Sequence, residues 1–410
     1  MYLTRLKKIS MHQKHLMTLA GSKTHIHGVL KSSSEDFIVE EIPLYEPCGE
    51  GEHLYLHVQK TNMSHEHLIR HIATFFAVKK RHIGSAGRKD LKAITSQWVS
   101  VHLPGQTVAV PDSIDGIKIC THSWHKNKLR AGHLTGNKFT LRLREVLKEN
   151  FDCLEQRLQA LQRNGLPNAF GPQRFGNKND NQFVGQYIIT KEWDKVVAVL
   201  LTGIDRHHEL ADAGKFQNAL DAWPFGQPAQ RNILEALARG KSAEQACKTI
   251  PHTLSKLCVN AFQALIFNEV LKRRVAANSF NTIVEGDLVW KLDGGGRTFE
   301  IALEEVGSPD IIERSMQFLI SPSGPLWGSK MRHPSADIER MEQEVLDGFG
   351  VTEEHLIGMK KFAEGARRPL CVPLKNTAIS LEKECVLVQF DLPAGSYATV
   401  VVEALLTGVL

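Results

Sequence analysis

The order of predicted secondary structure constrains the fold of this chain most strongly. The N-terminal part reads mainly as strands, residues 183–280 read mainly as helices, and the C-terminal part reads as strands again. At 410 residues the chain is longer than one core usually supports. We therefore expect an α+β domain formed by residues 1–164 and 371–410, interrupted by an inserted domain at 165–370.

Individual elements follow from period-2 or helical spacing of apolar residues. Strands are expected at 37–42, 53–58, 98–103, 138–144, 284–292, 299–303, 385–392 and 397–403. Helices are expected from 64 to about 77, at 152–164, 195–201, 232–238 and 253–275, and within 334–365. The first twenty residues are expected to be a loosely held leader.

Composition places the chain among globular proteins of a reducing compartment. Apolar residues make up 42% and charged residues 23%, and no run of 18 apolar residues occurs, so no membrane helix is expected. The seven cysteines are scattered, odd in number and without a CxxC pair. This pattern argues against a disulfide framework or a structural zinc site and favours a cytoplasmic location.

The distribution of charge is more informative than the net charge of +5. Residues 117–144 contain seven Lys or Arg and no Asp or Glu, whereas 334–366 is rich in acids. Patches of basic residues indicate a polyanionic partner. The alternative is that these long side chains simply solvate a pair of strands.

Asp90 stands out because it is the single acid in a basic stretch. Six Lys or Arg lie between positions 79 and 92, and Gly87 marks a turn just before Asp90. Nearby cations favour the carboxylate form, which suits a nucleophile beside a bound polyanion. A surface ion pair next to a turn is the simpler interpretation of such an aspartate.

Three further clusters combine turn residues with chemistry. Asn137 and Phe139 follow Gly136 and lie two residues apart, hence on one face of a strand, where an amide could read a base edge and a ring could stack on the base. Residues 165–176 are dense in Gly, Pro, Asn and aromatics, as at a rigid junction. Leu392–Thr399 reads as strand, turn and strand, with Tyr397 placed toward a cleft.

Metal and nucleotide-phosphate motifs are missing from the sequence. His122 and His125 lack the further ligands of a zinc site, and no P-loop or G-x-G-x-x-G spacing occurs. We therefore expect no metal and no cofactor.

Together the clusters resemble the TruD family of tRNA pseudouridine synthases. Residues 86–97 match its A-G-x-K-D-[RK]-x-A-x-T-x-Q segment, Gly136–Phe139 its G-N-x-F, and 165–176 its G-[VL]-P-N-Y-F-G-x-Q-R-F-G. Residues 392–399 match L-P-x-G-[SY]-[FY]-A-T, and 35–41 and 49–53 also match. The resemblance runs in the same order from about residue 28 to the C-terminus.

The resemblance implies a mixed-sheet pseudouridine synthase catalytic domain interrupted by a TruD-specific α/β insertion domain. It implies that Asp90 is the catalytic aspartate with Lys89 beside it. It also implies a set of contacts to a flipped uridine, namely Phe37, Asn137, Phe139, Tyr397 and Lys31. The implied substrate is tRNA at position 13 of the D-arm, with no membrane and no protein partner. The carboxylate would act by attack at C1′ or by removing the C2′ proton, and sequence does not choose between them.

The sequence departs from the family pattern at three positions. Leu91 replaces a basic residue, and Ala169 replaces an aromatic residue. Residues 402–405 are V-E-A-L where the family tends to have V-R-E-L, so Glu403 inverts a charge. The alternative functions are a non-catalytic RNA-binding protein or RNA chaperone of the same fold, and a metal-dependent nuclease. The Lys89–Asp90 pair disfavours the first, and the lack of clustered carboxylates disfavours the second.

Overall fold

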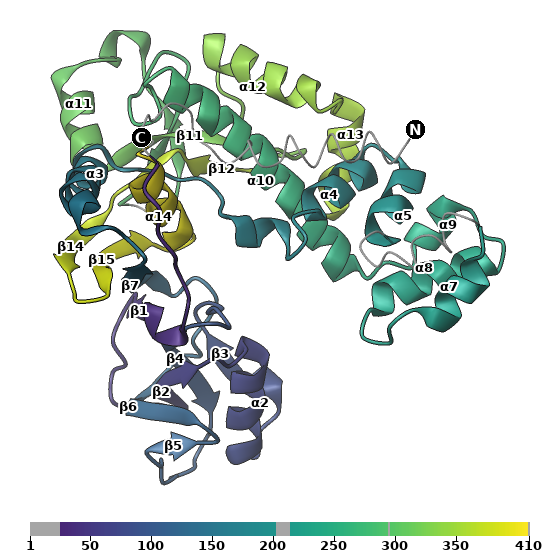
Figure 1. The fold of residues 1–410 in the computed structure, drawn as a ribbon, viewed down its shortest axis with the longest axis horizontal. Helices are drawn as coiled ribbons and strands as arrows, with labels where there is room; N and C mark the ends of the chain where they lie inside the picture. The colour runs from purple at the N-terminus through teal and green to yellow at the C-terminus, as the bar shows by residue number, and fades with distance from the viewer. Residues whose placement is uncertain (1–24, 202–213, 294–295, 409–410) are drawn as a thin grey trace. The chain divides into compact units, whose positions relative to one another are not determined.

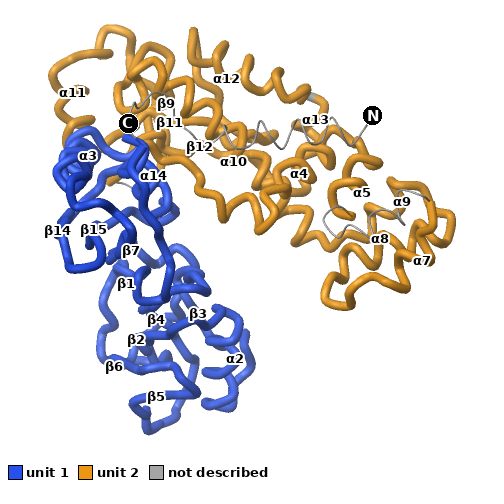
Figure 2. The backbone as a smooth tube through the Cα atoms, viewed as in Figure 1, with its two compact units in different colours: residues 1–166, 372–410 blue, residues 167–371 orange. Residues whose placement is uncertain are grey.

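The computed structural model describes residues 25–201, 214–293 and 296–408 (Figure 1). The chain divides into two compact units, the first formed by 1–166 with 372–410 and the second by 167–371 (Figure 2). The boundaries expected from sequence lie within two residues of these divisions. The chain passes between the units at β8 (Leu166–Pro167) and β13 (Cys371–Val372). The expected leader lies outside the described residues.

The first unit is built on a nine-stranded mixed sheet. From one edge to the other, its strands are β14 (Lys375–Leu381), β15 (Cys385–Pro393), β7 (Leu134–Arg144), β1 (Phe37–Pro43), β4 (Ile94–His102), β2 (His53–Thr61), β6 (Ile117–His125) and β5 (Ser113–Ile114), with β3 (Ile83–Ser85) paired to β4. Its helices are η1 (Ser34–Asp36), α2 (His65–Phe75), η2 (Lys80–His82), η3 (Lys148–Asn150), α3 (Phe151–Asn164) and α14 (Ala398–Thr407). The pairing of β1 with β4 is parallel, so the α+β class and the mixed sheet are confirmed.

Local sequence explains the main elements of this unit. In β1 the odd-numbered residues Phe37, Val39 and Glu41 are buried, as the period of a half-buried strand requires. Helix α2 starts at Ser64, whose hydroxyl accepts a hydrogen bond from the His67 amide. Its apolar face packs into a core with β2 and β4. The elements expected at 37–42, 53–58, 138–144 and 152–164 are thereby confirmed within a few residues.

The expected strand at 397–403 is wrong, because this segment forms α14. The run Val400–Val402 is β-branched, which favours a strand by propensity. In the structure, however, Gly395 takes a φ of 83°, and Tyr397 becomes the residue that precedes the helix. Helix α14 is buried on more than one side and contacts α3, so its sequence carries no polar stripe that would reveal a helix.

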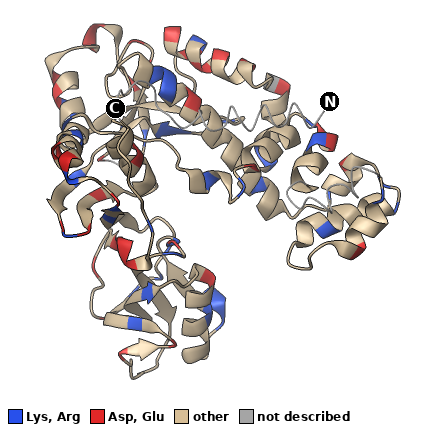
Figure 3. Cartoon of the chain, in the orientation of Figure 1, with Lys and Arg blue, Asp and Glu red and all other residues tan. Residues whose placement is uncertain are grey.

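The second unit is mostly helical, with a four-stranded sheet ordered β10 (Thr298–Glu300), β9 (Leu288–Lys291), β11 (Ile320–Leu326) and β12 (Ala366–Pro369). Its helices are η4 (Pro172–Phe175), α4 (Asn181–Ile189), α5 (Trp193–Leu201), α7 (Phe216–Ala222), α8 (Pro228–Ala238), α9 (Ala243–Cys247), α10 (His252–Ala276), η5 (Leu303–Glu305), α11 (Pro309–Met316), α12 (Ala336–Gly348), α13 (Glu353–Gly358) and η6 (Met359–Lys361). The long helix α10 packs against α4 and β11 and forms the centre of this unit. The acid-rich region lies largely on α12, where Figure 3 shows several acidic residues.

The Gly- and Pro-rich segment 165–176 joins the two ends of the second unit. Buried Asn168 donates through its amide to the Pro369 carbonyl at 2.9 Å and accepts from Arg368 at 2.6 Å. The backbone of Phe170 exchanges two hydrogen bonds with the Asn268 side chain, at 2.8 and 3.0 Å. This segment therefore has a structural role as a junction.

Among the described residues, no helix combines the length and the apolar character needed to cross a membrane. All seven cysteines are free thiols.

Candidate active site

Asp90 lies in the loop between β3 and β4. Strand β3, which leads into this loop, approaches Leu129 closely: a Cβ on Gly84 would lie 2.1 Å from the Leu129 carbonyl oxygen. The Ala86 carbonyl accepts from the Gly132 amide at 2.9 Å, and the Ala93 carbonyl accepts from the Asn62 amide at 3.2 Å. The loop is therefore fastened at both ends.

A buried lysine fastens the middle of the same loop. Lys60 on β2 is 1% exposed, and its ammonium donates to the Asp90 carbonyl at 2.9 Å and to the Met63 carbonyl at 2.6 Å. Burial lowers the pKa of Lys60 to about 8, opposed by the nearby charge of Asp90. Lys60 thus fixes the backbone from which the Asp90 carboxylate projects.

For the function that the family resemblance implies, we expect Lys60→Met to slow the chemical step without weakening RNA binding. Methionine has a similar length but cannot donate to the Asp90 carbonyl, and a small displacement of a reacting group can reduce a rate by up to about 100-fold. Single-turnover rates at saturating enzyme should fall by about 10- to 100-fold, while the Kd for tRNA stays within about twofold. An unchanged rate would show that Lys60 does not position Asp90.

The Asp90 carboxylate is open to solvent and lies beside one cation. Its side chain is 41% exposed, and its Oδ2 is 3.6 Å from Lys31 Nζ. The same ammonium lies 3.7 Å from the centroid of the Phe37 ring. Lys31 has a φ of 65°, a conformation that costs energy in a residue with a Cβ. The contact with Asp90 therefore depends on an unusual local backbone.

Lys89 belongs to a buried network. Its ammonium lies 2.9 Å from the Glu41 carboxylate and 2.5 Å from Asn137 Oδ1, and both charged side chains are at most 5% exposed. Burial lowers the pKa of Lys89, while Glu41 and Asp90 oppose this shift. Glu41 also accepts from the Trp98 amide at 3.2 Å. The network joins β1, β4 and β7 through one ion pair and two hydrogen bonds.

This network fixes the orientation of the Asn137 amide. An ammonium group has donors and no acceptor, so the amide oxygen must face Lys89. The Asn137 Nδ2 group then faces away from Lys89 as a donor. A donor at this position can bind a pyrimidine carbonyl oxygen.

The pairing of β7 with β15 brings Tyr397 to the same end of the sheet. Asn137 is opposite Leu392, and Gly136 is opposite Pro393. A Cβ on Gly136 would lie 2.2 Å from the Leu392 carbonyl oxygen, so this close approach requires glycine. The turn that follows β15 ends at Tyr397, which is half-buried at the start of α14.

Phe139 and Phe37 lie deeper than the sequence analysis implies. Phe139 is 6% exposed and stacks on Phe390, with centroids 5.4 Å apart, and Phe37 is 2% exposed with its ring edge-on to Phe139. Both rings share a sheet face with Glu41 and Asn137. In this structure the two rings pack beside the network of Lys89, Glu41 and Asn137 on that face of the sheet.

Many of the basic residues in 117–144 already have partners. Lys126 lies 2.6 Å from Glu50, and Lys128 donates to the Arg81 carbonyl at 2.6 Å. Arg144 makes three hydrogen bonds to the Asp36 carboxylate, which hold the pKa of Asp36 below its usual range. The charge of this stretch thus largely supports the fold.

Two of the three departures from the family pattern have ordinary surroundings. Leu91 is 53% exposed next to Asp90, where a basic residue would reach solvent. Ala169 is half-buried within the junction segment, beside the buried Phe170.

The third departure, Glu403 on α14, predicts a pH dependence of stability. Burial raises the pKa of Glu403 to about 7 from an ordinary value of 4.5, so the folded state holds a proton that the unfolded state releases. This contribution to stability is present below pH 4.5 and is lost as the pH rises through 7. We expect Glu403→Gln to raise the free energy of unfolding by about 1–3 kcal/mol at pH 8 and to change it little at pH 4.5.

Denaturant unfolding at the two pH values would measure this difference. Glu149→Gln, at an exposed position of the same unit, is the matched control and should show no such dependence on pH. Equal effects of Glu403→Gln at both pH values would contradict the expectation.

Sequence reasoning missed Glu41 and Lys60 as parts of the site. Both lie on strands that read as ordinary structural elements, and both reach the site only through strand register. A charged residue on the buried face of a predicted strand is the signal that could have revealed Glu41. Among the described residues, no group of three or more His, Cys, Asp or Glu side chains could hold a metal ion.

Comparison with known proteins identifies the family. The model of the family tRNA pseudouridine synthase D (TruD) matches residues 15–405. The chain belongs to the TruD family. The tRNA pseudouridine synthase D of Geobacter sulfurreducens is 36% identical over 385 residues, covering 91% of this chain and 92% of that protein. That of Syntrophotalea carbinolica is 34% identical over 387 residues, covering 92% and 95%.

A solved structure supports the same fold. The crystal structure of the putative tRNA pseudouridine synthase D from Methanosarcina mazei superposes with a TM-score of 0.78, at 24% identity and 95% coverage of both chains. The family model and the two relatives confirm the TruD resemblance inferred from the sequence motifs.

Proposed function

We propose that this protein isomerises a uridine of tRNA, at position 13 of the D-arm, to pseudouridine, with the Asp90 carboxylate as nucleophile or base. The observation that carries the proposal is the setting of Asp90. An exposed carboxylate projects from a loop fastened by buried Lys60 and lies next to Lys31. Membership of the TruD family supplies the reaction and the class of substrate.

The reaction exchanges one bond of the uracil for another. The N1–C1′ bond breaks, the uracil turns, C5 bonds to C1′, and the proton on C5 is lost as N1 gains one. The carboxylate can attack C1′, or it can remove the C2′ proton to give a glycal. Both routes use the carboxylate form of Asp90, whose Oδ2 lies 3.6 Å from Lys31 Nζ.

Asn137 is the residue that we assign to recognition of the base. The target uridine must leave the base stack, which costs a few kcal/mol and must be offset inside the site. The Nδ2 group of Asn137, oriented by Lys89, would donate to a uracil carbonyl. Tyr397 follows the β15 residues that pair with Gly136 and Asn137, which supports our assignment of this aromatic residue to contact with the base. Phe37 and Phe139 would support the base pocket from below.

Contacts to the RNA backbone would come from cations near the Asp90 loop. Lys79, Lys80, Lys92 and Arg130 are exposed. Among the described residues, none of them has an ion pair within 4.0 Å. They are better candidates than Lys126, which is paired with Glu50.

The proposal is tested by mapping pseudouridine in an unmodified tRNA transcript after incubation with the purified protein. A transcript in which cytidine replaces uridine 13 is the control. We expect product at position 13 of the first transcript and none in the second. Product at another position would contradict the assigned target, and tight binding without product would indicate a non-catalytic RNA-binding protein.

A further inference from the structure

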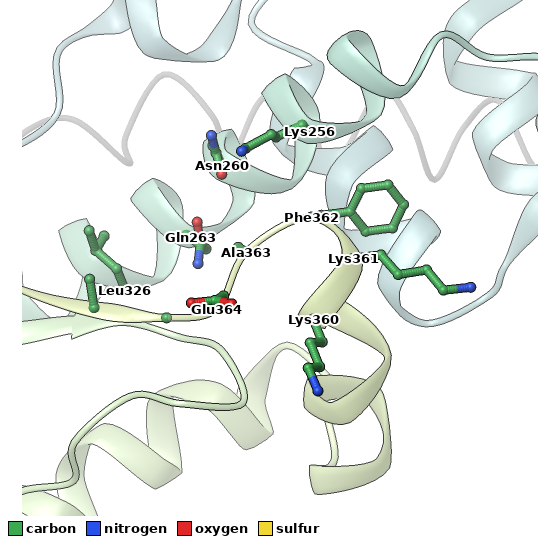
Figure 4. Close-up of a pocket in the computed structure, with 11 residues that line it drawn as sticks. Lys256, Asn260, Gln263, Leu326, Lys360, Lys361, Phe362, Ala363 and Glu364 are labelled. Carbon is green, nitrogen blue, oxygen red and sulfur yellow. The ribbon is translucent and has the colours of Figure 1, made fainter. Parts of the chain in front are cut away.

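The second unit contains a pocket of about 430 Å³ whose lining residues all belong to that unit. It lies between α10 and the loop that joins η6 to β12 (Figure 4). Lys256, Asn260 and Gln263 line it from α10, at spacings of four and three residues that place them on one helix face. Residues 360–366 form the opposite side.

Several contacts hold the loop in this shape. Phe362 stacks on His252 with centroids 5.5 Å apart, and His252 Nε2 lies 3.1 Å from the Lys361 carbonyl oxygen. At the other end, the Lys330 amide donates to the Glu364 carbonyl at 2.7 Å. A Cβ on Gly328 would lie 2.3 Å from the Gly365 amide nitrogen, so the two backbones are in close contact. The pocket is therefore formed before any ligand arrives.

The charges that line the pocket favour an anion. Glu364, its one acid, is paired with Lys330 at 2.9 Å, and this pairing holds the pKa of Glu364 below its usual value. Lys256, Lys360 and Lys361 have no acidic partner within 4.0 Å among the described residues. The lining residues thus include three lysines without an acidic partner within 4.0 Å, and the pocket also offers the Asn260 amide.

The positions of the lysines favour a nucleic-acid strand over a compact anion as the ligand. In Figure 4, the end of Lys256 lies toward Asn260, whereas the ends of Lys360 and Lys361 point away from Gln263. Cations directed both into and out of the pocket suit several consecutive phosphates. Lysine binds phosphate as a point charge and needs no fixed geometry.

We propose that this pocket binds backbone phosphates of the RNA substrate, at a position separate from the uridine that reacts. The inference rests on the proposed function for the identity of the RNA. On this proposal, the second unit contacts the tRNA directly and contributes to its affinity in addition to the Asp90 region. Loss of the pocket should weaken binding and leave the chemical step intact.

The test compares two triple variants with the same change in charge. The pocket variant carries Lys256→Gln, Lys360→Gln and Lys361→Gln. The control carries Lys215→Gln, Lys241→Gln and Lys291→Gln, at exposed positions of the same unit outside the pocket lining. For each we would measure the Kd for tRNA over a series of salt concentrations, and the single-turnover rate at saturating enzyme.

The pocket variant should bind tRNA roughly tenfold more weakly, and its slope of log K against log salt should be shallower by about 2. Its single-turnover rate should match the wild type, and the control should change the Kd by less than about threefold. Equal effects of the two variants, or an unchanged Kd, would overturn the inference. If the pocket variant binds tRNA as the wild type does, and only the wild type binds inorganic phosphate, the pocket is a small-anion site. This result would also overturn the inference. Binding of tRNA without product, in wild type and variants alike, would instead contradict the proposed function.

Discussion

Asp90→Asn should abolish formation of pseudouridine while tRNA binding stays within about twofold of the wild type. The amide has the size of the carboxylate but can neither attack C1′ nor accept the C2′ proton, so both routes are blocked. The loop should keep its conformation, because Lys60 bonds to the backbone of Asp90 and not to its side chain. We expect a single-turnover rate at least about 1,000-fold below the wild type.

The control for this variant is Asp112→Asn, which removes the same charge at an exposed position of the same unit. It should retain the wild-type rate. Residual turnover of Asp90→Asn above about one hundredth of the wild type would remove Asp90 from the role of nucleophile or base.

Lys89→Met should cause the largest loss of stability among changes at the site. It leaves the Glu41 carboxylate buried without its ion pair, and breaking a buried pair typically costs about 3–5 kcal/mol. Chemical denaturation would measure the free energy of unfolding. A loss below about 1 kcal/mol would show that the pair is exposed to water, contrary to its burial.

A second variant separates stability from orientation of the base. Lys89→Met combined with Glu41→Gln removes both charges, so most of the lost stability should return. The oxygen of Asn137 would still lack its donor, and its amide would be free to turn. We expect the double variant to fold and yet react about tenfold or more slowly, since a single hydrogen bond to a substrate contributes about this much. Recovery of both stability and rate would show that Lys89 serves the fold alone.

Much of the first unit can be predicted from local pattern. The strands β1, β2, β7 and β15 alternate with period 2 or form short apolar runs, and the helices α2 and α3 show helical spacing. Glycine also marks two close approaches of backbone segments near the candidate site. A Cβ added at Gly84 or Gly136 would lie 2.1 or 2.2 Å from a neighbouring carbonyl oxygen, so neither position accepts a side chain.

The remaining features depend on contacts that local pattern does not encode. Val400–Val402 favours a strand by itself, and only burial on several sides and contact with α3 make it helical. Lys89 follows Arg88 in a basic run, yet its ammonium turns inward because Glu41 lies across the sheet. Likewise, Lys60 reaches the Asp90 backbone through the pairing of β2 with β4. Register between distant strands therefore determined which charged residues belong to the site.

The most direct test of the account is to map pseudouridine at nucleotide resolution in an unmodified tRNA treated in parallel with wild-type protein and Asp90→Asn. Both proteins would be present in excess over RNA, and binding would be verified in the same samples. The account predicts pseudouridine at position 13 with the wild type and none with Asp90→Asn, although both bind. Pseudouridine at position 13 from both proteins, or from neither, would contradict it.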